Sequence, residues 1–265
     1  MLFRSIQLQE KLHATMGRKR AKGAIGIHDL AMLKGEVLTD EGGDNTITYR
    51  GVAPDGDRFV ALDSNDELTP QEVLERHPTG KKYADLVSEY ERYPAIYDEL
   101  GLFSFPPVIN GRRTEVDTDS RDLLVELTGT DQWTIDRMCT IICYALSARG
   151  ATIEQVEVAY ADEARAPDDG AHLVRPDFSV DEKTVSHDRI ESVLGVDLDS
   201  EEVVDLFERS GLDATYTLGD EVAYDVEVPP YRVDVLHPLD LIDDVGRAYG
   251  FNELEPTYPD VSTVG

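Results

Sequence analysis

Apolar and polar positions along the chain change period several times, most clearly between residues 122 and 161. Residues 122–127 read as a strand. After a short polar loop, apolar side chains recur at helical spacing as far as Arg149, and Gly150 follows as a helix terminator. Residues 152–160 alternate as a second strand. This succession indicates a domain that mixes helices with sheet.

The rest of the first 165 residues gives shorter signals of both kinds. Helices are predicted over residues 5–16, 69–76 and 83–90, and strands over residues 24–30, 46–49, 58–62, 95–97 and 102–105. Residues 164–171 have the composition of a linker. We therefore expect a mixed α/β domain at residues 1–165.

A second, smaller unit is expected at residues 172–256, followed by a tail at residues 257–265. Its pattern predicts helices over residues 186–194 and 200–210, followed by a hairpin of strands at 214–218 and 222–228. A final helical element is predicted within residues 229–251. The fold class is therefore α+β, with a mixed α/β domain followed by a small α+β domain.

Carboxylates are concentrated in the element at residues 229–251. Asp240, Asp243 and Asp244 are spaced to share one helical face, and Asp234 lies six residues ahead of Asp240. Four carboxylates around one point would suit a hard cation such as Mg²⁺. Arg247 could instead neutralise the last two, and acidic residues also favour the first turns of a helix. Both interpretations stay open at this point.

The overall charge is strongly negative, with 54 acidic against 25 basic residues and a formal net charge of −29. The acidic residues are spread through amphipathic segments, which fits adaptation to molar salt, where charge repulsion is screened. We expect a halophilic source. The sequence contains neither a signal peptide nor an apolar run of transmembrane length, so a cytoplasmic protein is expected. Cys139 and Cys143 are predicted to be reduced core residues.

Residues 1–36 oppose this charge. They hold three acidic residues and seven basic ones, namely Arg4, Lys11, Arg18, Lys19, Arg20, Lys22 and Lys34. Basic residues in such an acidic chain suggest a phosphate-bearing partner such as RNA, although pairing with internal carboxylates would explain them equally well.

Familiar catalytic motifs are absent from the sequence. It contains no phosphate-binding loop, dinucleotide fingerprint, serine nucleophile elbow or zinc helix. His28 and Asp29 are adjacent in a predicted strand, so they point to opposite faces and form no dyad. His237 is expected to pack or to cap a helix.

Four separated segments resemble the β subunit of phenylalanine–tRNA ligase of the archaeal and eukaryotic type. They are residues 5–30 (SIQLQEKLHATMGRKRAKGAIGIHDL), 105–111 (FPPVING), 126–131 (ELTGTD) and 229–251 (PPYRVDVLHPLDLIDDVGRAYGF). The resemblance implies a B3/B4 editing domain followed by a B5 domain of winged-helix-like type. It also implies phenylalanine tRNA and the α subunit of a heterotetramer as partners, without DNA or membrane.

Site residues follow from the same resemblance. The expected magnesium ligands, associated with the α-subunit contact, are Asp234, Asp240, Asp243 and Asp244. The expected editing residues are Ser104, Asn110, Glu126 and Thr128, with His28 near the substrate. The expected tRNA-binding residues are Gln9, Lys11, Arg18, Lys19 and Arg20.

The implied reaction is hydrolysis of tyrosine wrongly attached to phenylalanine tRNA. A pocket that selects Phe rejects an added hydroxyl poorly, so a second site must recognise that hydroxyl. Glu126 is the candidate to accept its proton, and polar groups would orient a water. The alternative functions are a non-catalytic tRNA-binding and assembly module of the synthetase, or an unrelated RNA binder. Because the family continues on both sides of these motifs, we expect an internal piece of the ligase, without an ATP site of its own.

Overall fold

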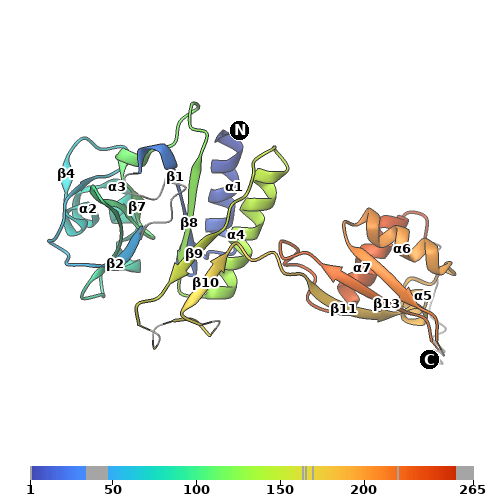
Figure 1. Ribbon diagram of the computed structural model, residues 1–265. Helices are drawn as coiled ribbons and strands as arrows, with labels where there is room; N and C mark the ends of the chain where they lie inside the picture. The colour runs from blue at the N-terminus through green and yellow to red at the C-terminus, as the bar shows by residue number, and fades with distance from the viewer. Residues whose placement is uncertain are drawn as a thin grey trace, which may run out of the picture. The chain divides into compact units, whose positions relative to one another are not determined.

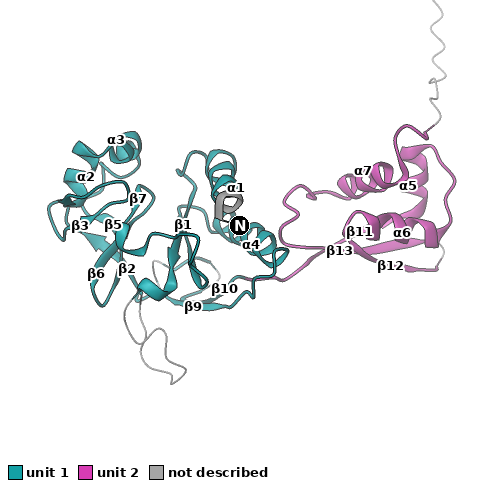
Figure 2. Cartoon of the chain, turned by 90° about the horizontal axis from the view of Figure 1, so that it is seen from above, with its two compact units in different colours: residues 1–176 teal, residues 177–265 magenta. Residues whose placement is uncertain are grey.

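The computed structural model describes residues 2–33, 47–162, 164, 166–168, 170–219 and 221–254. It divides into two compact units, Met1–Pro176 and Asp177–Gly265 (Figure 2). The tail expected at residues 257–265 and the start of the strand expected at residues 46–49 lie outside the described residues. Both described parts combine helices with sheet, so the predicted α+β class is confirmed.

The first unit contains four helices, ten strands and short 3-10 turns among its described residues. The helices are α1 (Leu2–Ala14), α2 (Pro70–Arg76), α3 (Pro78–Tyr83) and α4 (Gln132–Ser147). The strands are β1 (Gly23–Asp29), β2 (Thr48–Val52), β3 (Phe59–Val60), β4 (Glu67–Leu68), β5 (Tyr93–Asp98), β6 (Gly101–Phe105), β7 (Ile109–Asn110), β8 (Leu123–Gly129), β9 (Val156–Ala159) and β10 (His172–Arg175).

An antiparallel ribbon of β1 and β8 forms the middle of this unit (Figure 1). Because side chains alternate along a strand, each face of the ribbon carries a different set. One face packs on α1 and α4, where Ile25 joins Leu12 and Met138 in a buried apolar cluster. On the opposite face, Gly26 lies across from Glu126. The ribbon is therefore apolar towards the helices and polar on its other side.

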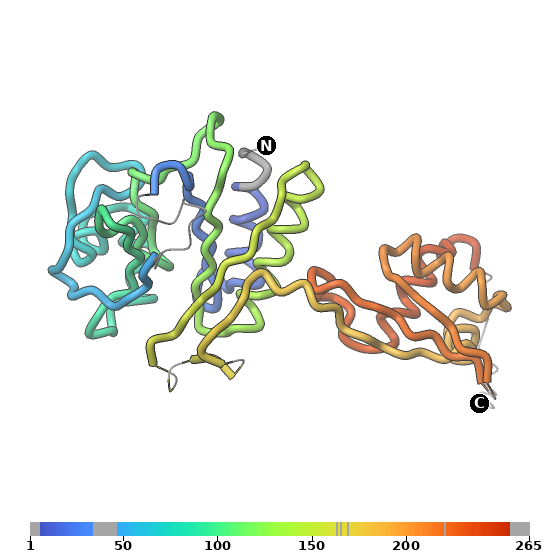
Figure 3. The backbone as a smooth tube through the Cα atoms, in the orientation of Figure 1, coloured from blue at the N-terminus to red at the C-terminus, as the bar shows by residue number. Residues whose placement is uncertain are grey.

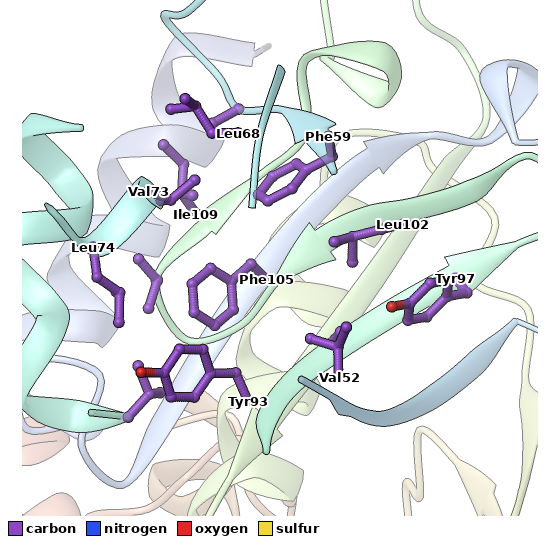
Figure 4. Packing of buried hydrophobic residues seen from close by; sticks show 14 residues of the cluster. Val52, Phe59, Leu68, Val73, Leu74, Tyr93, Tyr97, Leu102, Phe105 and Ile109 are labelled. Atoms are coloured by element: carbon purple, nitrogen blue, oxygen red, sulfur yellow. The ribbon is translucent and has the colours of Figure 1, made fainter. Parts of the chain in front are cut away.

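A second sheet, in the order β2-β5-β6-β7, carries the largest apolar cluster of the unit. In Figure 4 the rings of Tyr93 and Phe105 lie close together, and their centroids are 5.8 Å apart in a stacked arrangement. Helix α2 closes this core with Val73 and Leu74. It begins at the predicted place, because Thr69 forms a capping box with Glu72 and Pro70 occupies the first turn.

The helix predicted over residues 83–90 is wrong. Helix α3 begins earlier, at Pro78, where the His77 side chain accepts a hydrogen bond from the Thr79 amide. It ends at Tyr83 and is followed by a 3-10 turn over Ala84–Leu86. The proline in the first turn and the His77 cap place the helix closer to the N-terminus than predicted.

The boundary between the units also differs from the expected linker at residues 164–171. Strands β9 and β10 pair with each other and run side by side as a hairpin (Figure 3). Arg175 in β10 is bound to Asp136 of α4 through a 2.8 Å ion pair. The first unit therefore extends to Pro176, and the linker-like segment connects two strands of one unit.

In its described residues, the second unit combines a three-stranded sheet in the order β11-β13-β12 with three helices. Its elements are β11 (Asp181–Ser186), α5 (His187–Leu194), α6 (Ser200–Arg209), β12 (Asp213–Thr217), β13 (Ala223–Val228) and α7 (Pro238–Tyr249). Its core is built around the buried ring of Tyr224 and the side chains of Phe207 and Ile242. Strand β11 was missed in the sequence because its polar residues give no apolar alternation. Among the described helices of the chain, none combines the length and the apolar character needed to cross a membrane.

Candidate functional site

Glu126 occupies the polar face of the β1–β8 ribbon, opposite Gly26. A Cβ atom at position 26 would lie 2.3 Å from the Glu126 Oε1 atom, so only glycine leaves room for this carboxylate. The Glu126 side chain is 13% exposed. A carboxylate laid across a glycine and withdrawn from solvent is unusual for a structural role.

A cavity of about 190 Å³ opens beside this carboxylate. It brings together four residues that the resemblance implied, from four separate elements or loops: Gln9, Arg20, Asn110 and Glu126. The rest of its wall is formed by Ala24, Ile25, Leu62, Asp63, Thr79 and the segment 106–109. Pockets for drug-sized ligands usually measure about 300–1,000 Å³. This cavity therefore suits one amino-acid side chain better than a whole nucleotide.

The other three expected editing residues lie around this cavity without lining it. Ser104 is fully buried, and its hydroxyl donates to the Asn110 Oδ1 atom over 3.1 Å. Thr128 lies on β8 opposite Ala24, on the same ribbon face as Glu126. His28 lies on that face too, with its Nε2 atom 4.0 Å from Glu126 Oε1. The ribbon thus gathers polar side chains beside the cavity.

Unsatisfied polar atoms mark this site. Among the described residues, the buried side-chain atoms without a hydrogen-bond partner are Arg20 Nε, His28 Nε2, Glu126 Oε2 and Thr128 Oγ1. Folded proteins pair the large majority of buried polar atoms, and each exception costs about 1–3 kcal/mol. All four belong to residues named from the sequence, in the cavity or on the adjoining ribbon face. Their convergence indicates a site arranged for a polar ligand or water.

Arg20 holds the cavity together. Its guanidinium donates to the carbonyls of Pro107 and Val108, at 3.3 and 3.0 Å, and lies over the Tyr83 ring. It also contacts the Glu10 carboxylate at 3.3 Å. Four contacts within the chain make Arg20 a scaffold of the cavity wall rather than a freely accessible phosphate ligand.

Gln9 and His13 connect α1 to the backbone of the buried strand. Gln9 donates to the Ile25 carbonyl over 2.8 Å, and the His13 Nε2 atom accepts from the Ile25 amide over 2.8 Å. The other ring nitrogen of His13 contacts Glu10 at 3.0 Å. Burial lowers the pKa of His13, and the charge of Arg20 lowers it further. A neutral, fully bonded His13 is therefore structural.

Three other expected tRNA-binding residues are exposed. Lys11, Arg18 and Lys19 make no ion pair among the described residues and point into solvent. Arg18, Lys19 and Arg20 have φ angles of 46°, 58° and 71°. Consecutive left-handed residues other than glycine cost about 1–2 kcal/mol each. This strained turn separates two exposed cations from the inward-facing Arg20.

The acidic element of the second unit is arranged differently. Asp234 and Asp244 both bind the guanidinium of Arg232, at 2.9 and 2.5 Å. The hydrogen bond to Asp234 raises the pKa of Arg232, and the same contact lowers the pKa of Asp234. Asp243 pairs with Arg247 at 2.6 Å.

Asp240 caps helix α7. Its carboxylate accepts from the amides of Leu236 and His237 at 2.9 and 2.7 Å, while the His237 side chain accepts from the Leu239 amide. This is a capping box with histidine at the N-cap, and it confirms the predicted capping role of His237. Each of the four aspartates thus has a partner from its own unit.

These partners bear on the expected Mg²⁺ site. A cation site needs several oxygen ligands turned to one point. Within the part of the chain that the structure describes, no three His, Cys, Asp or Glu side chains are placed to hold a metal ion. The folded chain by itself therefore presents no preformed Mg²⁺ site at Asp234, Asp240, Asp243 and Asp244, because Arg232, Arg247 and the helix start bind oxygens of these carboxylates.

A larger, open pocket of about 520 Å³ lies on the second sheet. It contains none of the expected site residues, and some of its polar groups bind one another. Tyr97 donates its hydroxyl to Asp57 over 3.0 Å, and Arg50 lies 4.0 Å from the Tyr97 ring centroid. We assign no role to this pocket.

Two residues at the site were missed in the sequence. Thr114 is fully buried and contacts His28, and Asp63 lines the cavity with a φ angle of 58°. Neither belongs to a recognisable spacing, because Thr114 lies in a short 3-10 turn and Asp63 in a loop, far along the chain from the residues they approach. Asp63 could have been suspected only as a residue that tolerates left-handed backbone.

Comparisons with known proteins give the class and then the family. A family model described as the tRNA synthetase B5 domain matches residues 183–251, so the second unit is a domain of the tRNA synthetase class. The phenylalanine–tRNA ligase beta subunit of Halorubrum lacusprofundi is 76% identical over 98% of the chain and 45% of the relative. That of Haloarcula marismortui is 69% identical over 98% and 44%.

A solved structure agrees with these sequences. The crystal structure of an N-terminal fragment of the phenylalanyl-tRNA synthetase beta-subunit from Pyrococcus horikoshii matches with a TM-score of 0.82 and 30% identity, over 94% of this chain and 66% of that one. The chain belongs to the phenylalanine–tRNA ligase β-subunit family, a family of aminoacyl-tRNA synthetase subunits. It spans about half the length of the curated relatives it matches. The haloarchaeal sources of those relatives fit the halophilic composition.

Proposed function

We propose that the first unit hydrolyses tyrosine from mischarged phenylalanine tRNA, as the editing part of a phenylalanine–tRNA ligase. The observation that carries this proposal is the group of unpartnered buried polar atoms around the 190 Å³ cavity. A cavity of this size would take the amino-acid side chain, and Glu126 would accept the proton of a phenolic hydroxyl. A phenylalanine ring would leave the carboxylate unpaired, which is the basis of strong discrimination.

Hydrolysis in this proposal uses water rather than a protein nucleophile. Asn110, held by Ser104 over 3.1 Å, and Thr128 offer polar atoms that would orient the water and the ester carbonyl. Oriented groups lower the barrier because they are positioned before the reaction begins.

The exposed cations would hold the tRNA. Lys11, Arg18 and Lys19 present positive charge near the cavity in a chain of net charge −29. Phosphate contacts of this kind weaken steeply as salt increases. In molar salt they would contribute orientation more than affinity.

We further propose that Mg²⁺ and the α subunit act together at the acidic element. Asp234 and Asp243 are exposed, with side chains 61% and 48% accessible, so a partner chain could reach them. A metal there would need added ligands from that partner and a displaced Arg232. Mg²⁺ alone is then expected to leave the thermal unfolding midpoint of the chain unchanged, whereas a shift with Mg²⁺ alone would contradict the proposal.

Deacylation tests the main proposal. The chain is incubated in molar KCl with Tyr-tRNA(Phe) and, separately, with Phe-tRNA(Phe), and released amino acid is measured. We expect release of tyrosine well above the buffer rate and little release of phenylalanine. Binding of tRNA by folded protein without release of tyrosine would instead support a non-catalytic tRNA-binding and assembly module.

A further inference from the structure

Thr114 does not line the cavity, but its side chain contacts His28. It closes the 3-10 turn Arg112–Thr114, it is fully buried, and its Oγ1 atom lies 2.8 Å from the Nδ1 atom of His28. Its other contact, to the Gly111 carbonyl, is 3.5 Å long. A neutral imidazole has one donor and one acceptor nitrogen, and the neighbours decide which is which.

Glu126 determines the arrangement at the other nitrogen. An ionised carboxylate only accepts hydrogen bonds, and its Oε1 atom faces His28 Nε2 at 4.0 Å. A proton on Nε2 is therefore favoured over a lone pair. The Nδ1 atom must then accept, and the Thr114 hydroxyl is the group beside it that can donate. The 2.8 Å distance suits such a bond, whereas 3.5 Å is at the limit of one.

We propose that Thr114 is a positioning residue that fixes His28 with its proton on Nε2, so that His28 and Glu126 bind one hydroxyl between them. The 4.0 Å separation is too long for a direct hydrogen bond. A hydroxyl oxygen between the two groups accepts from His28 and donates to Glu126. An ammonium cannot accept and a carboxylate cannot donate, so this pair selects a neutral hydroxyl such as a phenol. The inference rests on the proposed function and adds the second contact to the substrate hydroxyl.

The turn that carries Thr114 is held independently of its hydroxyl. Arg113 binds Asp98 through two hydrogen bonds of 2.9 and 2.7 Å and also reaches the Met32 carbonyl. The His28 ring is held edge-on to Phe103, with centroids 5.0 Å apart. Removing the Thr114 hydroxyl alone should therefore leave the turn and the ring in place.

Side-chain ¹⁵N NMR of the histidines in the full chain tests the proposal. We expect the proton of His28 on Nε2 in the wild type, a mixture of both tautomers in Thr114→Val, and the wild-type state restored in Thr114→Ser. Thr140→Val, which removes a buried hydroxyl from α4, is the matched control and should leave His28 unchanged. A wild-type proton on Nδ1, or an unchanged tautomer in Thr114→Val, overturns the inference.

Ligand titration tests whether His28 and Glu126 bind a phenolic hydroxyl. Added L-tyrosinamide is expected to shift the His28 Nε2 resonance, and L-phenylalaninamide at the same millimolar concentration is not. Equal shifts, or none with either, contradict the shared hydroxyl. Because neither readout uses hydrolysis, a chain that passes both tests but releases no tyrosine from tRNA would refute the proposed reaction and leave this inference standing. In an active chain, Thr114→Val should lower the preference for Tyr over Phe about fivefold.

Discussion

The two acidic sites of this chain differ in whether their polar atoms are satisfied. In the second unit, Asp234, Asp240, Asp243 and Asp244 are all paired with arginines or with backbone amides. In the first unit, Glu126 keeps an unpartnered buried oxygen, and Arg20, His28 and Thr128 beside it each keep an unpartnered buried polar atom. The acidic element of the second unit stands out by its density of charge, whereas the Glu126 site of the first unit stands out by its unpaired polar atoms. The comparison indicates that ligand chemistry belongs to the less charged site.

The largest expected effect follows from replacing the unpaired carboxylate. Glu126→Gln keeps the shape of the side chain but weakens acceptance of a phenolic proton. The preference for Tyr-tRNA(Phe) over Phe-tRNA(Phe) in deacylation should fall about 100-fold, the equivalent of one lost charged hydrogen bond. Glu154→Gln, at an exposed position, is the control and should change nothing. An unchanged preference in Glu126→Gln, or a fall of the same size in Glu154→Gln, would contradict the role given to the unpaired carboxylate.

Breaking a satisfied carboxylate should instead affect stability. Asp244→Asn removes a largely buried partner of Arg232, with side chains 11% and 16% exposed. Hydrogen exchange of amides in α6 and α7 should show a loss of about 2 kcal/mol. Asp243→Asn, in an exposed pair spaced i, i+4, should cost less than about 0.5 kcal/mol. Equal costs would mean that burial does not separate the two pairs.

A smaller effect on selectivity is expected from Gly26→Ala. The added methyl group would displace the Glu126 carboxylate, because a Cβ atom at position 26 would lie 2.3 Å from its Oε1 atom. Because that atom is the end of a flexible side chain, the fold should persist while the Tyr preference falls about tenfold. Unchanged selectivity in a folded variant would show that Glu126 need not lie across the ribbon.

The smallest expected effect concerns acid stability of the first unit. His13 has a pKa lowered by burial, so its neutral form stabilises the fold fully above about pH 6.5, the unfolded value. As the pH falls from 6.5 through the pKa that His13 has in the folded protein, this contribution should be lost. The free energy of unfolding should fall by about 1 kcal/mol for each unit by which folding lowers that pKa. Urea unfolding followed through Trp133 measures it.

His13→Gln should remove this part of the pH dependence. The exposed His172→Gln variant serves as the control and should retain it. If the free energy of unfolding of the wild type did not change as the pH falls below 7, the conclusion that His13 is neutral and structural would be contradicted.

The sequence predicted the two separate strands of the ribbon and the acidic helix well, because each of these elements depends on a local pattern. Strand β8 and helix α4 follow from alternation and from the Asp131 cap, and the side chains of Asp240, Asp243 and Asp244 lie on one helix as their spacing indicated. The spacing could not show that Arg232 binds Asp244, because that pair depends on how residues 229–237 fold back.

The set of residues around the cavity could not be predicted from local patterns for the same reason, because it depends on the tertiary fold. Glu126 and Asn110 were identified through a resemblance, and the spacing between them carries no signal. Thr114 touches His28 across 86 positions of sequence, and no local pattern predicts such a contact. The inward turn of Arg20 depends on three left-handed residues whose identities favour no such backbone.

The most direct test of the account compares two ligands at the cavity by calorimetry. The full chain in molar KCl is titrated with adenosine carrying tyrosine through a non-hydrolysable 3′-amide, and then with the phenylalanine counterpart. The account predicts that the tyrosyl compound binds at least about tenfold more tightly, because its hydroxyl pairs buried groups that phenylalanine leaves unpaired. Equal dissociation constants for the two compounds would contradict it.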